Sequence, residues 1–150
     1  VLYYKDYAKM SIEDLFDSQQ LAKALIYEID RLDTTVFLNK NGSFTPMDLP
    51  QEAQYTSIYS MRESDINQDG ITDIILGGNQ YKIKPQFGRQ DASKGGVIYG
   101  EKIDGEYRLN TFKHLNIEGQ IRDISTLNNS NKKGLIFARN NEPIIYFENE

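Results

Sequence analysis

The chain has 150 residues, the length of a single domain with a core of its own. Its formal net charge is −5 with 26% charged residues, which argues against a role on nucleic acid, because that role needs a concentrated basic face. The absence of cysteine excludes disulfides and zinc–sulfur sites. No apolar run approaches the roughly 20 residues that cross a bilayer, so we expect no membrane span.

The first ten residues, VLYYKDYAKM, lack the basic and apolar regions of a signal peptide, and the chain does not begin with Met. We therefore expect a mature or excised piece of a longer protein. Three tyrosines stand close together here, at Tyr3, Tyr4 and Tyr7. The pattern favours the packing face of an edge strand over an exposed strip that binds sugar or protein.

The segment 11–24 is the one region with a helical pattern. Ser11 and Asp17 are N-cap residue types, and each is followed three positions later by a capping-box partner, Asp14 and Gln20. We therefore predict two brief helices or one kinked helix, as a short helical insertion before the strands.

After Asp33 the apolar residues recur with a period of two, which is typical of strands. Asn41-Gly42 and Asp104-Gly105 are hairpin turn pairs, since both members of each pair tolerate positive φ. The predicted strand segments lie within 34–47, 57–61, 72–78, 96–109, 120–127, 133–140 and 143–148. This pattern of short strands predicts an all-β fold.

Two sequence matches recur at one spacing. Val36 and Val97, each at the start of a hairpin, are 61 positions apart, and so are Asn79 and Asn140, each at the end of an apolar strand. We predict a single domain over 1–150 with repeat units at approximately 34–94 and 95–150. Four strands per unit is the pattern of a β-propeller, so we expect about two blades and a partial one.

The loop DINQDGITD, from Asp65 to Asp73, has the spacing of a calcium site. Its polar residues occupy positions 1, 3, 5 and 9, with Gly70 at the bend. Ca²⁺ takes six to eight oxygen ligands, and a loop wound round the ion supplies them from alternating residues. The predicted ligands are the side chains of Asp65, Asn67, Asp69 and Asp73 and the carbonyl of Ile71.

Two other interpretations of this loop exist. An EF-hand needs a glutamate at position 12 on an exiting helix, but that position is Leu76, inside a predicted strand. A metal-free loop of Asx-turns is the other alternative, and it leaves Asp73 without a role. With the offset of 61, the second repeat places Thr126, Asn128, Ser130 and Gly134 at the equivalent positions. All four are uncharged, so we expect no metal there.

With these residues, the chain resembles the FG-GAP or VCBS repeat family, the calcium-loop blades of integrin-like β-propellers. The stretch DINQDGITDIILGGN carries the resemblance, and the flanks are similar to the C-terminal end of large exported bacterial proteins. The resemblance covers nearly the whole chain and implies Ca²⁺ binding by the loop. A closed propeller needs about four blades or more. The partner expected is therefore the rest of a propeller, or a second copy through self-association.

Other polar residues give weaker signals. His114, the single histidine, has no nucleophile in a catalytic setting, so we expect a surface or packing role. Arg89, Asp91 and Ser93 lie in the long connection 80–94 and could form a ligand-facing cluster. The pattern favours another interpretation, in which Asp91 and Ser93 cap local turns and Arg89 pairs with an acid of the sheet. We identify no catalytic residue and expect no enzyme.

These features predict a calcium-stabilised binding or scaffolding module of an exported protein. Its location would be extracellular, at the cell surface or periplasmic, and its ligand a protein or a glycan. The alternative is the non-catalytic part of a secreted enzyme that acts on glycans.

Overall fold

The computed structural model describes residues 3–128 and 133–148. By its internal contacts the chain divides into two compact units, Val1–Leu32 and Asp33–Glu150. None of the described helices is long and apolar enough to span a membrane.

The first unit contains three helices of four residues each, α1 (Tyr4–Tyr7), α2 (Ile12–Leu15) and α3 (Ser18–Leu21). Ser11 and Asp17 are the N-caps of α2 and α3, and each makes the predicted capping box, with Asp14 and Gln20. The prediction of two brief helices is confirmed. Each box satisfies amide groups that the first turn leaves without partners.

The expectation that the first tyrosines form an edge strand is wrong. Tyr4 and Tyr7 lie in α1, because the carbonyl of Tyr3 accepts hydrogen bonds from the amides of Asp6 and Tyr7. The exposed fractions of Tyr3, Tyr4 and Tyr7 are 64%, 93% and 55%, so within this unit these rings have no packing face.

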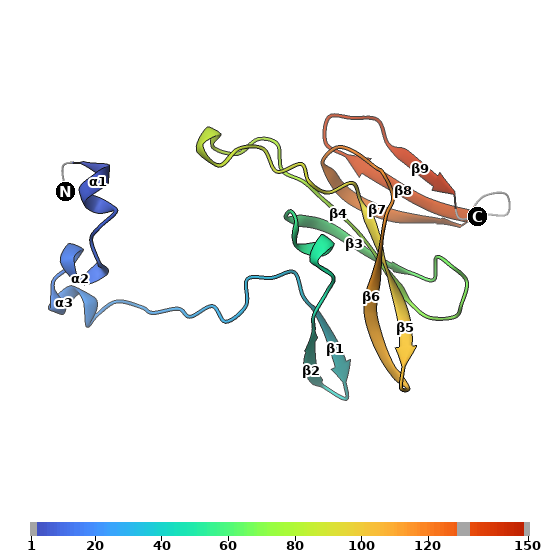
Figure 1. Cartoon of the computed structure of the whole chain (residues 1–150), viewed down its shortest axis with the longest axis horizontal. Coiled ribbons are helices and arrows are strands. Elements are labelled where there is room, and N and C mark those ends of the chain that lie inside the picture. Colours follow the sequence, from blue (N-terminus) through green and yellow to red (C-terminus); the bar gives the residue numbers. More distant parts are fainter. Residues whose placement is uncertain (1–2, 129–132, 149–150) are drawn as a thin grey trace. The chain divides into compact units, whose positions relative to one another are not determined.

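The second unit is built of antiparallel strands, and the all-β prediction is confirmed at this level (Figure 1). A two-stranded, a four-stranded and a three-stranded sheet have the orders β1-β2, β3-β4-β5-β6 and β7-β8-β9. Two short 3₁₀ helices, Gln51–Gln54 and Pro85–Phe87, lie between strands. The strands are β1 (Val36–Lys40), β2 (Ser43–Met47), β3 (Ile58–Ser64), β4 (Asp73–Gly78), β5 (Gly96–Ile103), β6 (Glu106–His114), β7 (Ile121–Asn128), β8 (Lys133–Arg139) and β9 (Ile145–Glu148).

Two hairpins turn at the predicted residue pairs. Asn41 and Gly42 have φ of 53° and 87°, and Asp104 and Gly105 have φ of 53° and 80°. Two successive positive φ values give a turn whose twist matches that of the flanking strands. Hairpins β1–β2 and β5–β6 are therefore alike in their turns.

The hairpins β3–β4 and β7–β8 share one register. Ile58 pairs with Gly78 before a bulge, and the pairing resumes through to Ser64 opposite Asp73. Ile121 likewise pairs with Arg139 before a bulge, and the pairing resumes past Leu127 opposite Gly134 and ends one pair later, at Asn128 opposite Lys133. The bulge lies at the same place in both hairpins, so the internal similarity extends to backbone pairing.

The four-stranded sheet combines strands from both predicted repeat units, 34–94 and 95–150. Its strands β3 and β4 come from the first unit, and β5 and β6 come from the second. The boundary between the two predicted repeat units therefore lies in the middle of this sheet, between β4 and β5. The described residues form no closed barrel or propeller.

Both faces of the four-stranded sheet are covered by apolar side chains. On one face, Leu76 and Ile98 pack with Met47 and with Val36 and Leu38 of the first hairpin. On the other face, adjacent residues of the same strands pack against the three-stranded sheet, with core members Ile75, Val97, Ile117, Ile121, Ile124, Leu135 and Phe137. Adjacent residues of a strand point to opposite faces, which explains why β4 is apolar throughout.

Candidate functional site

The loop 65–72 joins β3 to β4 and contains most of the predicted calcium ligands. Two of its residues have positive φ, Gln68 at 60° and Gly70 at 82°. A Cβ added to Gly70 would have no atom within 4 Å, so the requirement for glycine is conformational and not spatial. The predicted bend at Gly70 is confirmed.

The side chains of the loop hydrogen-bond to its own backbone. Asp65 accepts the amide of Asp69 at 3.1 Å on Oδ1 and the amide of Gly70 at 2.9 Å on Oδ2. Asp69 Oδ1 accepts the amide of Ile71 at 2.7 Å. Asn67 donates from Nδ2 to Asp69 Oδ2 at 2.7 Å. These bonds wind the chain round three exposed side chains that alternate along it.

Asp73 lies in a different environment. It is the first residue of β4, and its exposed fraction is 0%. Its Oδ2 accepts the amide of Ile66 at 2.9 Å, and its Oδ1 accepts the amide of Gly100 at 2.9 Å. The metal-free alternative therefore does give Asp73 a role, contrary to the expectation from the sequence. This carboxylate joins the start of the loop to strand β5.

Gly100 and Tyr107 fix the end of the loop. A Cβ on Gly100 would lie 2.1 Å from the carbonyl oxygen of Thr72, so only glycine permits this approach. The hydroxyl of Tyr107 donates to the same carbonyl at 2.7 Å. Burial, followed by the charges of Asp73 and Glu63, raises the pKa of Tyr107 above its usual value. All of these effects disfavour the phenolate, so the phenol keeps the proton that it donates.

The donors of the loop suit a hard cation in their chemistry. Every one is an oxygen, which Ca²⁺ prefers. A carboxylate offers about four lone-pair sites, and the amide bonds at Asp65, Asp69 and Asp73 use only part of them. In the described ranges, however, no three His, Cys, Asp or Glu side chains are gathered as a metal-binding group. The structure brings Asp65, Asn67 and Asp69 together and keeps Asp73 in the sheet.

The second hairpin has a shorter loop than the first. Eight residues separate Ser64 from Asp73, and six separate Leu127 from Gly134. By strand register Asp65 therefore corresponds to Asn128, so the sequence alignment of Asp65 with Thr126 is wrong by two positions. Gly134 still corresponds to Asp73, as predicted. Ser130, the remaining residue of that prediction, lies outside the described residues.

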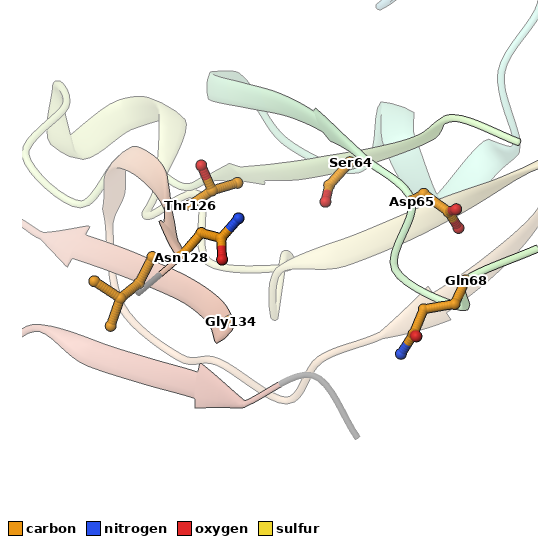
Figure 2. A pocket seen from close by; sticks show the side chains of 7 residues that line it. Ser64, Asp65, Gln68, Thr126, Asn128 and Gly134 are labelled. Carbon is orange, nitrogen blue, oxygen red and sulfur yellow. The ribbon is translucent and has the colours of Figure 1, made fainter. Parts of the chain in front are cut away.

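The two hairpin ends face each other across a cavity of about 350 Å³. Figure 2 shows Ser64, Asp65 and Gln68 on one side of this cavity and Thr126, Asn128 and Gly134 on the other. Among these residues only Asp65 is charged. One carboxylate does not balance a divalent ion, so the described residues around the cavity do not make a second cation site by themselves.

Sequence reasoning missed a buried polar junction at the opposite end of β4. Asn79 is 1% exposed with φ of 82°, and its Nδ2 donates to the carbonyls of Ser93 and Gly119 at 2.7 and 2.9 Å. Its Oδ1 accepts the amide of Ser93 at 3.0 Å. An asparagine directly after Gly77-Gly78 was the available signal, because asparagine tolerates the left-handed region better than most residues.

Arg122 completes this junction. Its guanidinium donates to the carbonyl of Asn79 at 2.9 Å and to Gln80 Oε1 and Gln120 Oε1 at 2.8 and 2.9 Å. It also lies over the ring of Tyr59, 4.0 Å from the centroid. Five donors in a planar fork can make these contacts at once. The junction joins β3, the end of β4 and β7.

The connection 80–94 holds its polar residues by local contacts. Arg89 pairs with Asp91 at 3.2 Å and lies 3.5 Å from the ring centroid of Tyr81. Ser93 Oγ accepts the amide of Gly95 at 3.2 Å. The local role expected for Ser93 fits this contact, but the expected pairing of Arg89 with an acid of the sheet is wrong, because its partner Asp91 lies in the same connection. His114 is exposed and packs edge-on to Phe112, which confirms a surface or packing role.

No family model, no curated protein and no solved structure matches the chain. The resemblance to FG-GAP or VCBS repeats consequently depends on the residues of the loop and its flanks.

Proposed function

We propose that the chain is a calcium-stabilised β-sheet module of the FG-GAP or VCBS type that binds or holds other molecules. The observation that carries the proposal is the loop 65–72. It winds round Asp65, Asn67 and Asp69, and the buried Asp73 anchors it to β5. A loop built in this way collects negative charge at one point of the surface, and a divalent cation would stabilise it.

The ion would be held by the side-chain oxygens of Asp65, Asn67 and Asp69, with the carbonyl of Ile71 and the carboxylate of Asp73 as the remaining protein ligands. Its two positive charges would offset most of the repulsion among the three aspartates. The ion would be structural. Bound only by the folded state, it would stabilise the loop that connects β3 to β4.

The sheets support the blade interpretation. The strands β3 to β6 follow one another in order, and both faces of that sheet are packed against another sheet. The three-stranded sheet repeats the first part of this arrangement. Phe37 and Phe44 on the first hairpin are 53% and 64% exposed. Rings in this position suit packing against a further sheet, from the rest of a propeller or from a second copy.

Binding or scaffolding is the activity that we assign to such a module, in an exported, cell-surface or periplasmic protein. Its ligand would be a protein or a glycan. The second candidate is the non-catalytic part of a secreted enzyme that acts on glycans. A hydrolytic assay of this chain beside a longer parent protein separates the two, and activity of this chain alone would contradict both.

The calcium proposal is tested by thermal unfolding with added Ca²⁺ and with excess chelator. At a concentration 100 times Kd, Ca²⁺ should add about 2.7 kcal/mol to the free energy of unfolding. Asp69→Ala should abolish the response, whereas Asp123→Ala, at an exposed aspartate of β7, should keep it. Identical melting curves of the wild-type chain with Ca²⁺ and with chelator would refute the proposal.

A further inference from the structure

A polar cavity of about 150 Å³ lies where three segments of the second unit meet. These segments are 79–81 at the end of β4, 89–94 of the long connection, and 118–119 before β7. None of the residues that line the cavity belongs to the loop 65–72. The cavity is therefore separate from the residues that we assign to calcium.

Hydrogen bonds fix the three segments to one another. The side chain of Asn79 bonds to Ser93 and also donates to the carbonyl of Gly119. The amide of Ile117 donates to the carbonyl of Lys94 at 2.8 Å. Binding of a ligand would thus require little ordering of the chain, and a site formed in advance binds more tightly than one that must be ordered.

Two pairs of opposite charges border the cavity. Arg89 and Asp91 lie 3.2 Å apart, and 3.9 Å separates Lys94 Nζ from Glu118 Oε1. The second distance is too long for a hydrogen bond. All four side chains are more than half exposed, so the two pairs contribute little to the free energy of unfolding. These four groups therefore keep hydrogen-bonding capacity for a ligand.

The charges around the cavity suit an uncharged polar ligand. Two cations and two carboxylates sum to zero, so neither an anion nor a cation gains a net attraction. An apolar ligand would remove water from charged groups and give no hydrogen bond in return. A hydroxyl both donates and accepts hydrogen bonds. Neighbouring hydroxyls can therefore bond to a carboxylate and to the cation beside it, and a sugar ring has such hydroxyls on adjacent carbons.

We propose that this cavity binds one sugar residue of a neutral glycan. The inference rests on the proposed binding function and names its ligand. The ring hydroxyls donate to the carboxylates of Asp91 and Glu118 and accept from Lys94 and Arg89. Contact with the ring of Tyr81 limits the orientation of the Arg89 guanidinium. A volume of about 150 Å³ has room for one sugar ring, so the rest of the glycan extends into solvent.

The probes are the methyl glycosides of glucose, galactose, mannose and N-acetylglucosamine. Each is titrated into the ¹⁵N-labelled full chain, with Ca²⁺ present throughout. At least one should shift the backbone amide signals of Ser93, Gly95 and Gly119 to saturation, with a Kd of about 1–10 mM. About 0.5 M NaCl should change this Kd by less than about twofold, because the ligand is uncharged.

Three variants test the side chains. Lys94→Ala and Glu118→Ala each remove one charged group from the cavity and should each raise the Kd at least about fivefold. Both side chains are exposed, so the amide spectrum away from the cavity should stay unchanged and show that the variants fold. Lys102→Ala, at an exposed lysine of β5, is the matched control and should keep the wild-type Kd.

The absence of saturable shifts at the cavity amides with all four glycosides would overturn the proposal. So would shifts that Lys94→Ala and Glu118→Ala leave unchanged. Free glycine and alanine are the control ligands, and tighter binding of either one would show that the cavity takes a zwitterion instead. A stabilising response to Ca²⁺ without sugar binding would contradict only this inference, and sugar binding without that response would contradict only the calcium site.

Discussion

The backbone amide of Gly100 donates a hydrogen bond of 2.9 Å to the carboxylate of Asp73, across the pair of strands β4 and β5. The other carboxylate oxygen accepts the amide of Ile66, at the opposite end of the loop. One buried side chain therefore joins the two ends of the loop to each other and to strand β5, which is distant in sequence. Its position, and not only its charge, determines the shape of the loop.

Replacement of Asp73 should be far more costly than replacement of its neighbours in the loop. In Asp73→Asn the amide nitrogen would face one of two N–H donors and leave it without an acceptor. We expect a loss of about 1–3 kcal/mol in the free energy of unfolding, measured with urea in excess chelator so that no metal contributes. The exposed Asp69→Asn should lose much less. Equal losses would show that Asp73 is not a buried anchor.

Tyr107→Phe tests the other end of the loop. Removing the hydroxyl should cost about 1 kcal/mol at pH 8, since the carbonyl of Thr72 loses its partner. The pKa of Tyr107 is raised in the folded state, so the folded chain binds more protons above pH 10 than the unfolded chain. The contribution of Tyr107 to the free energy of unfolding is therefore complete below the usual pKa of 10.0. It is lost as pH rises through the higher pKa of the folded state.

Urea unfolding between pH 8 and pH 11 measures this effect. The wild-type chain should lose stability more steeply above pH 10 than Tyr107→Phe. Tyr99→Phe, at a residue that makes a packing contact in the core, is the matched control and should follow the wild-type slope. Parallel curves for all three proteins would contradict the assignment.

The substitution Arg122→Lys should destabilise the folded chain. A lysine ammonium cannot reproduce the planar guanidinium of Arg122, which binds three acceptors and lies over the ring of Tyr59. We expect Arg122→Lys to lower the free energy of unfolding by about 1–3 kcal/mol in urea titrations. Arg108→Lys, at an exposed pair with Glu106, should change it by less than about 0.5 kcal/mol. A similar effect of both substitutions would mean that the junction is not structurally important.

The strands, the two hairpin turns and the capping boxes were predictable because each depends on residues adjacent in sequence. Asn41-Gly42 and Ser11 with Asp14 are local signals of this kind. The role of Asp73 was not predictable, because its partner Gly100 lies 27 positions away on another strand. The junction of Asn79 with Arg122 depends on a separation of 43 positions for the same reason. The alignment of Asp65 with Thr126 failed because loop length changes without altering strand register.

The last prediction is that the chain binds one calcium ion and not two. The second hairpin has the register and the bulge of the first, so the residues that correspond to Asp65 and Asp73 can be identified in it. At those places, however, Asn128 replaces Asp65 and Gly134 replaces Asp73. A divalent cation that entered this loop would lose water ligands, and neither of these two positions would supply a carboxylate to replace them. Calorimetric titration should therefore give one site, which Asp65→Asn eliminates and Asn128→Ala leaves unchanged. A second site of comparable affinity in the wild-type chain would show that the shorter loop also binds the ion.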